Sequence, residues 1–194
     1  MALHVDRMVV GREDRAAHYL TSAGCVLVVA DGAGGTGDGA HAADAVIEAV
    51  AANRELQGAD AWAALLAQID ATLRNGETTA VVAAIIGNEI HGASVGDSGA
   101  WLIDAHGYDE LTQGQQRKPL IGSRRASPVP FASRLDAATL LLASDGLLNY
   151  APAQRIAELA NIAELSGLAT RLCDLVRLRS GALPDDVAIL LARV

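Results

Sequence analysis

The sequence contains short apolar runs and longer segments with a helical pattern of apolar residues. Runs rich in Val, Ile, Leu and Ala that end in turn residues are typical of buried strands. We expect strands at residues 26–30, 78–86, 90–95, 100–103, 140–143 and 187–191. Helical patterns predict helices over 39–52, over 60–74 with Asp60 as N-cap, from near Pro152 to Leu159, and over 165–179.

The order of these elements indicates the fold class. A doubly wound parallel sheet requires strands and helices to alternate throughout. Here the central strands follow one another over short turns, which favours antiparallel pairing, and the helices come in pairs. We therefore expect an α+β fold, with sheet flanked by paired helices, in a single domain over residues 1–194.

Composition and charge narrow the class of protein. Hydrophobic residues make up 51% of the chain, which is enough for a sizeable core and argues against disorder. The net charge is −8, and no basic face for nucleic acid is apparent. The segment 117–134 is locally basic, and we interpret it as a solvated loop.

The remaining features of composition concern thiols and location. We expect Cys25 and Cys173 to be buried free thiols, since two cysteines make no disulfide framework. No apolar run approaches the roughly 18 residues of a membrane span. The N-terminus lacks the apolar region of a signal peptide, so a cytoplasmic location is the default expectation.

Acidic residues recur where the expected strands begin or end. Asp31, Asp97 and Asp145 follow strands, and Asp185 and Asp186 precede the last one. Carboxylates at the ends of neighbouring strands can converge, because strands lie about 4.8 Å apart. Converging carboxylates repel one another unless a cation neutralises them, and Mg²⁺ or Mn²⁺ prefers such oxygen ligands. Two such cations can bind phosphate and activate a water for in-line attack.

These segments resemble motifs of the protein phosphatase 2C family. They occur in the family's order across nearly the whole chain: Val29-Ala30-Asp31-Gly32-Ala33-Gly34-Gly35, Thr78-Thr79-Ala80, Val95-Gly96-Asp97-Ser98, Ala143-Ser144-Asp145-Gly146-Leu147 and Asp185-Asp186-Val187-Ala188. The resemblance implies an α-β-β-α sandwich of two mainly antiparallel sheets. It also implies a metal-dependent phosphatase that removes phosphate from serine or threonine with a metal-activated water.

The resemblance also implies a binuclear Mn²⁺ or Mg²⁺ centre. Asp31 would bridge both ions, and the carbonyl of Gly32 would contact the second. Asp145 and Asp185 would complete the shell of the first ion, and Asp97 would help to bind a looser third ion.

The segment Arg12-Glu13-Asp14 resembles the family's Asn-Glu-Asp segment. There Glu13 and Asp14 would hold metal-bound waters. The family usually has a phosphate-binding arginine a few residues earlier. Arg7 and Arg12 are both candidates, and neither has the usual spacing.

The chain also departs from the family between its Gly-Asp-Ser and Ser-Asp-Gly segments. The family usually carries an insertion there, called the flap, but only residues 99–143 are available here. The segment Leu111-Thr112-Gln113-Gly114-Gln115 resembles a family element without its Asp and His. A short flap predicts a more open cleft, with substrate choice depending on a partner. A phosphoprotein substrate is expected, and the family suggests a serine/threonine kinase partner.

Two other interpretations remain open. Residues 32–37 fit the G-x-G-x-x-G dinucleotide fingerprint, but Asp31 would oppose a pyrophosphate, and the second strand of a Rossmann unit does not follow. Alternatively, the chain is a catalytically silent phosphatase-like module that docks onto a phosphoprotein or kinase. The retained Asp31, Asp145 and Asp185 argue against that alternative.

Overall fold

The computed structural model describes residues 3–34, 38–162 and 164–194 and shows two antiparallel sheets packed face to face. The first sheet has the strand order β1-β10-β9-β6-β7. Its members are β1 (His4–Val10), β10 (Val187–Arg193), β9 (Thr139–Ala143), β6 (Gly99–Asp104) and β7 (Gly107–Glu110).

The second sheet has the order β2-β3-β4-β5-β8, and all of its pairings are antiparallel. Its members are β2 (Arg15–Leu20), β3 (Gly24–Ala30), β4 (Ala80–Ile86), β5 (Glu89–Val95) and β8 (Val129–Arg134).

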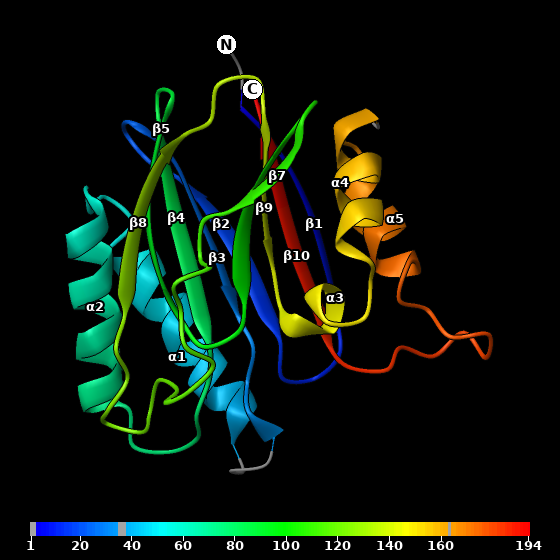
Figure 1. The fold of residues 1–194 in the computed structure, drawn as a ribbon. Helices are drawn as coiled ribbons and strands as arrows, with labels where there is room; N and C mark the ends of the chain where they lie inside the picture. The colour runs from blue at the N-terminus through cyan, green and yellow to red at the C-terminus, as the bar shows by residue number, and fades with distance from the viewer. Residues whose placement is uncertain (1–2, 35–37, 163) are drawn as a thin grey trace.

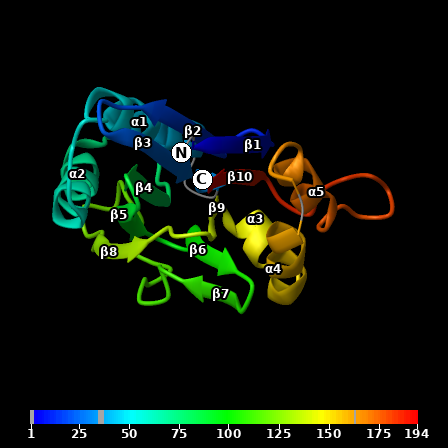
Figure 2. The same ribbon diagram turned by 90° about the horizontal axis from the view of Figure 1, so that it is seen from above.

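Helices cover the outer face of each sheet, so the molecule has four layers (Figures 1 and 2). Two helices pack on the second sheet, α1 (Gly39–Ala52) and α2 (Ala59–Thr72). Three shorter helices lie beside the first sheet, α3 (Asp145–Leu148), α4 (Ala153–Ile162) and α5 (Leu168–Asp174). The expected α+β sandwich with flanking helices is confirmed.

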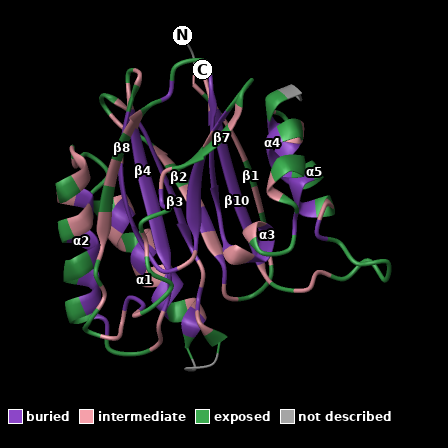
Figure 3. Ribbon diagram, in the orientation of Figure 1, coloured by how far each residue is buried: buried purple, intermediate pink, exposed green. Residues whose placement is uncertain are grey.

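The central strands are apolar because both of their faces are covered. Successive side chains of a strand point to opposite faces of its sheet. Along β3, Val26 and Val28 pack against α1 and α2, whereas Leu27 and Val29 pack between the two sheets. Figure 3 shows the resulting continuous burial of the central strands and the exposed outer sides of the helices. This double burial explains the unbroken apolar runs in the sequence.

Most predicted elements are confirmed, with shifts at their ends. The helix over 39–52 has the predicted bounds. Asp60 is not an N-cap, because helix α2 begins one residue earlier and Gly58 takes the capping position. The last helix is shorter than predicted and covers only Leu168–Asp174.

Strands β1, β2, β7 and β8 were not predicted, because they lie towards the edges of the sheets and carry polar residues. Strand β8 shows the reason, since it contains Pro130 and alternates half-buried and exposed positions. Cys25 and Cys173 are free and buried, as predicted. No helix in the described residues is long and apolar enough to cross a membrane.

Candidate metal and phosphate site

One end of the sandwich carries a pocket of about 560 Å³ that is rich in carboxylates. It lies where β3, β5 and β9 end and where β4 and β10 begin. We call it the acidic pocket. It is lined by Glu13, Asp31, Gly32, Ala33, Gly34, Thr79, Asp97, Arg117, Lys118, Leu120, Asp145 and Asp185. The structure therefore brings together every predicted metal ligand except Asp14, which is buried.

Backbone and hydroxyl groups at the start of β4 hold Asp31 in place. The carbonyl of Asp31 accepts hydrogen bonds from the Thr79 N–H at 2.9 Å and the Thr78 hydroxyl at 2.8 Å. The Asp31 N–H donates to the Thr79 hydroxyl at 3.1 Å, and that hydroxyl lies 2.6 Å from Ser98 Oγ. The backbone bonds fix where the Asp31 side chain leaves the chain, and they leave its carboxylate available to a ligand.

Gly32 is required by the close approach of helix α1. A Cβ atom at this position would lie 2.4 Å from the carbonyl carbon of Gly39, at the first turn of that helix. The glycine lets the backbone after Asp31 pass the helix and line the acidic pocket.

The N-terminal acidic segment is fixed by a residue from the other end of the chain. Asp186 Oδ2 accepts hydrogen bonds from the backbone N–H groups of Arg12 at 2.6 Å and Glu13 at 2.7 Å. These bonds hold Glu13 at the pocket and Asp14 just behind it. Asp186 therefore has a positioning role, while its neighbour Asp185 lines the pocket.

Asp145 begins helix α3, directly after strand β9. The side-chain amide of Asn149 donates to Asp145 Oδ2 at 2.9 Å. At the next residue, a Cβ on Gly146 would lie 1.8 Å from the carbonyl oxygen of Asp186. The Ser-Asp-Gly segment thus places a carboxylate at the pocket and lets α3 pack tightly on the start of β10.

Asp97 forms an ion pair with a cation that was not predicted to belong to the site. Arg117 Nε donates a hydrogen bond to Asp97 Oδ2 at 2.8 Å, and Arg117 Nη2 lies 2.7 Å from the same oxygen. Arg117 Nη2 also lies 3.9 Å from Asp145 Oδ2. The guanidinium is therefore at the pocket, although 72% of the Arg117 side chain remains exposed.

Burial and mutual repulsion disfavour ionisation of these carboxyl groups. Burial, followed by the charges of Asp14 and Asp145, raises the pKa of Asp31 to about 9. Burial also raises the pKa of Asp14 to about 6. For Asp145, burial and the charges of Asp97 and Asp185 raise the pKa.

The chemistry of this pocket fits a hard divalent cation. Asp14 is 1% exposed, and among the described residues neither of its carboxylate oxygens has a partner that meets hydrogen-bond geometry, although Ser144 and Asp31 are near enough to affect its pKa. Buried carboxylates without partners are costly, and a cation would neutralise them. Within the described chain, no three acidic, histidine or cysteine side chains converge on a single ion position. The assignment of individual ligands therefore remains a prediction.

The two arginines predicted to bind phosphate do not line the acidic pocket. Arg7 lies on β1, and its guanidinium donates to the carbonyl of Ala16 at 3.1 Å. Arg12 is exposed, and its backbone rather than its side chain is bonded to Asp186. Their role in phosphate binding stays a prediction.

The interpretation of residues 117–134 as one solvated loop is corrected by the structure. Arg117 and Lys118 line the acidic pocket, and Val129–Arg134 forms strand β8. The clustered basic residues were the signal in the sequence, but nothing there placed them beside Asp97. In the segment that lacks the family's Asp and His, Thr112 is buried and its hydroxyl accepts a hydrogen bond from the Ala100 N–H at 3.2 Å.

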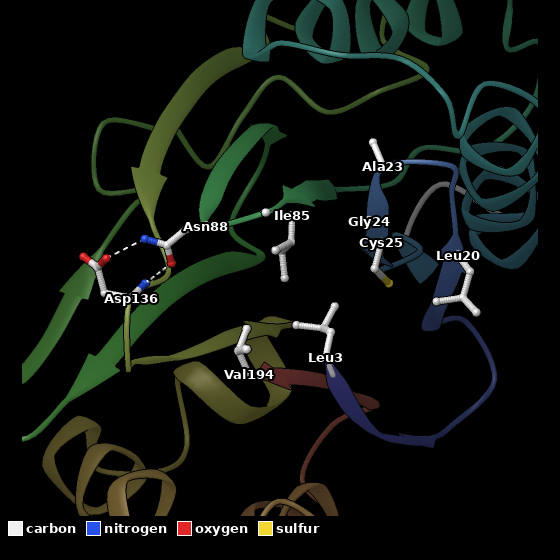
Figure 4. A pocket seen from close by; sticks show the side chains of 10 residues that line it. Leu3, Leu20, Ala23, Gly24, Cys25, Ile85, Asn88, Asp136 and Val194 are labelled. Carbon is white, nitrogen blue, oxygen red and sulfur yellow. Dashed lines mark hydrogen bonds between the residues drawn. The ribbon is translucent and has the colours of Figure 1, made fainter. Parts of the chain in front are cut away.

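A pocket of about 570 Å³ lies at the opposite end of the same strands. Leu3, Leu20, Ile85 and Val194 contribute apolar side chains to it, and Asn88 and Asp136 are hydrogen-bonded to each other at its edge (Figure 4). Among the described residues of its lining, Asp136 is the only acidic one, so this pocket differs from the acidic pocket with its crowded carboxylates.

A comparison with protein families matches residues 21–194 to the model described as Stage II sporulation protein E (SpoIIE). The chain belongs to this family. No curated protein matches the SpoIIE-type chain.

Several solved structures with the same fold as this SpoIIE-type chain are bacterial phosphatases. A bacterial serine phosphatase has a TM-score of 0.87 at 22% identity, over 100% of this chain and 98% of the other. The serine/threonine phosphatase Stp1 from Staphylococcus aureus has a TM-score of 0.82 at 21% identity, over 100% and 96%. The catalytic domain of the serine/threonine phosphatase PstP, in complex with two manganese ions, has a TM-score of 0.78 at 24% identity, over 98% and 97%. The resemblance to the protein phosphatase 2C family is confirmed.

Proposed function

We propose that this SpoIIE-type domain is a metal-dependent phosphatase that hydrolyses phosphoserine or phosphothreonine in a phosphoprotein. The observation that carries the proposal is the acidic pocket, where Asp31, Asp97, Asp145 and Asp185 gather beside the buried Asp14, whose carboxylate has no hydrogen-bond partner in the described part of the chain. The fold shared with bacterial phosphatases, one of them in complex with two manganese ions, supports it. A serine/threonine kinase that acts on the same phosphoprotein is the expected partner.

In this proposal, some residues of the acidic pocket would bind the cations and others would hold Asp31 in position. Asp31, Asp145, Asp185 and the Gly32 carbonyl would hold two Mn²⁺ or Mg²⁺ ions, with Glu13 and Asp14 behind them and Asp97 near a third. When bound, such ions lower the pKa of water and offset charge on phosphoryl oxygens. The Thr78, Thr79 and Ser98 hydroxyls would keep Asp31 in position while the substrate binds.

Arg117 is the candidate for binding the substrate phosphate in place of Arg7 or Arg12. Its guanidinium lies in the acidic pocket between Asp97 and Asp145 and is largely exposed, so an incoming phosphate can reach it. Arginine suits phosphate because its planar fork donates two parallel hydrogen bonds.

A catalytically silent module that docks onto a phosphoprotein or kinase is the second candidate. The observation that favours it is the ion pair between Arg117 and Asp97, because a guanidinium can neutralise part of the pocket without a metal. Hydrolysis of p-nitrophenyl phosphate and of a phosphothreonine peptide, in Mn²⁺ and in EDTA, separates the two. Turnover that requires Mn²⁺ supports the phosphatase. A folded protein that binds Mn²⁺ but turns over neither substrate supports the silent module.

A further inference from the structure

A second pocket adjoins the acidic pocket, and Lys118 and Leu120 line both of them. Its volume is about 460 Å³. We call it the flanking pocket, and it is lined by Glu77, Lys118, Pro119, Leu120, Ser123 and Arg125. A peptide whose phosphorylated residue lies in the acidic pocket would therefore extend past the flanking pocket.

The flanking pocket reverses the charge of its neighbour. It presents two cations, Lys118 and Arg125, against the single carboxylate of Glu77. Neither cation forms an ion pair with any residue that the structure describes, whereas Arg117 is paired with Asp97. Lys118 is also the only lysine in a chain of net charge −8. Two cations without an ion-pair partner among the described residues thus lie beside the place where phosphate would bind.

The loop that carries Lys118 and Arg125 is held in place by hydrogen bonds to a buried carboxylate. Asp70 on α2 is 5% exposed, and its carboxylate accepts hydrogen bonds from the N–H groups of Gly122 at 2.8 Å, Arg124 at 2.9 Å and Ala126 at 3.0 Å. Two backbone hydrogen bonds of 3.0 Å also tie Ile121 to Thr78, next to Asp31. A fixed loop loses little conformational entropy when it binds a ligand, so its charges are preorganised.

From these observations we infer that the flanking pocket binds an anionic side chain close in sequence to the phosphorylated serine or threonine. The inference rests on the proposed function, and it gives the enzyme a preference for phosphopeptides with anionic neighbours. The anion is either the carboxylate of Asp or Glu or the phosphoryl group of a second phosphorylated residue. Lys118 spans the two pockets and would contact both anionic groups.

The test compares three phosphothreonine peptides of otherwise identical sequence. The residues on both sides of the phosphothreonine are Gln in the first peptide, Glu in the second and phosphoserine in the third. For each peptide, kcat/KM is measured in Mn²⁺, and binding of a labelled copy is measured in parallel by fluorescence anisotropy. The comparison of the second and third peptides distinguishes the two sources of negative charge.

Three variants test the flanking pocket, two with opposite expected changes and one as a control. Arg125→Glu should lower the ratio of kcat/KM for the Glu peptide over the Gln peptide by about threefold or more, the size of an exposed charge pair. Glu77→Gln should raise that ratio, because it removes the competing carboxylate. Arg179→Glu makes the same change in net charge in the exposed turn after α5 and should leave the ratio unchanged.

The outcomes separate this inference from the proposed function. The unmodified protein could bind and turn over the Glu, phosphoserine and Gln peptides equally. That result would contradict the proposed role of the flanking pocket without contradicting the proposed phosphatase function. An equal loss in Arg125→Glu and Arg179→Glu would also overturn it, since the effect would then be one of overall charge. Tighter binding of the Glu peptide without turnover of any substrate would support the pocket and contradict the phosphatase.

Discussion

Asp186 and Glu13 are joined by a hydrogen bond of 2.7 Å from the Glu13 N–H to Asp186 Oδ2, across 173 positions of the chain. The bond joins the turn after β1 to the residue just before β10, and these two strands are paired throughout their length. A residue beside the predicted ligand Asp185 therefore positions the predicted ligands at the other end of the chain.

Removing this acceptor should weaken both the fold and cation binding. Asp186→Ala leaves the N–H groups of Arg12 and Glu13 without their charged partner, and we expect a loss of about 2 kcal/mol in the free energy of unfolding. The affinity for Mn²⁺ should fall as well, since outer-shell partners commonly change it by about tenfold or more. Denaturant titration and Mn²⁺ titration calorimetry measure the two effects.

The matched control for that variant is Asp186→Asn. Its amide oxygen can still accept both hydrogen bonds, so most of the stability and Mn²⁺ affinity should remain. If the Ala and Asn variants bind Mn²⁺ equally well, Asp186 has no positioning role.

The carboxyl groups of the acidic pocket should make the metal-free protein sensitive to pH. The pKa of Asp31 rises from an ordinary value of 3.8 to about 9 in the fold, so the folded state binds more protons than the unfolded state between these values. Stability in EDTA should therefore fall as pH rises from about 4 towards 9. Thermal unfolding in EDTA across this range measures the effect.

Two further measurements check the cause of that pH dependence. Asp31→Asn should be more stable than the unmodified protein in EDTA at alkaline pH, by on the order of a few kcal/mol. Mn²⁺ should raise the melting temperature of the unmodified protein more at alkaline than at acidic pH, because protons compete for its ligands. Stability that rises with pH in EDTA would contradict this account of Asp31.

Gly146 should tolerate no side chain. Its Cβ would lie 1.8 Å from the backbone carbonyl oxygen of Asp186, and we expect Gly146→Ala to cost about 1–3 kcal/mol through overpacking. Gly114→Ala is the matched control, since a Cβ there would meet no atom of a described residue within 4 Å. Denaturant titration compares the two variants, and an equal, small change in both would show that the start of β10 can shift away from α3.

Arg117 should affect substrate binding more than stability. Arg117→Ala removes an exposed guanidinium, so we expect little change in unfolding but a KM for p-nitrophenyl phosphate higher by about tenfold. Arg117→Lys should recover part of this loss. If Arg7→Ala or Arg12→Ala raises KM instead, while Arg117→Ala does not, the phosphate-binding residue lies near the N-terminus as the sequence predicted.

The sequence predicted the elements whose burial is complete on both faces. Strand β3 was predictable because Val26–Ala30 is buried against helices on one side and strands on the other. Strand β8 was not, because an edge position allows Pro130 and polar residues. The aspartates of the acidic pocket were predictable because each follows or precedes an apolar strand, whereas Glu13 was predicted from the resemblance of Arg12-Glu13-Asp14 to a family segment.

The cationic side of the site could not be predicted in the same way. Arg117 and Lys118 reach the pockets because long-range bonds hold their loop in place. Asp70 accepts a hydrogen bond from the N–H of Gly122, 52 positions later in the chain, and Ile121 pairs with Thr78. No local pattern in the sequence reports these long-range bonds. The basic segment was visible, but its place beside Asp97 depends on the tertiary structure.

The most direct test of the central claim is phosphate release from a phosphothreonine peptide by the unmodified protein and by Asp31→Asn. We predict turnover in Mn²⁺ that disappears in EDTA, and no turnover above background in Asp31→Asn although that variant remains folded. Full turnover by Asp31→Asn, or equal turnover in Mn²⁺ and EDTA, would contradict a metal-dependent phosphatase centred on Asp31.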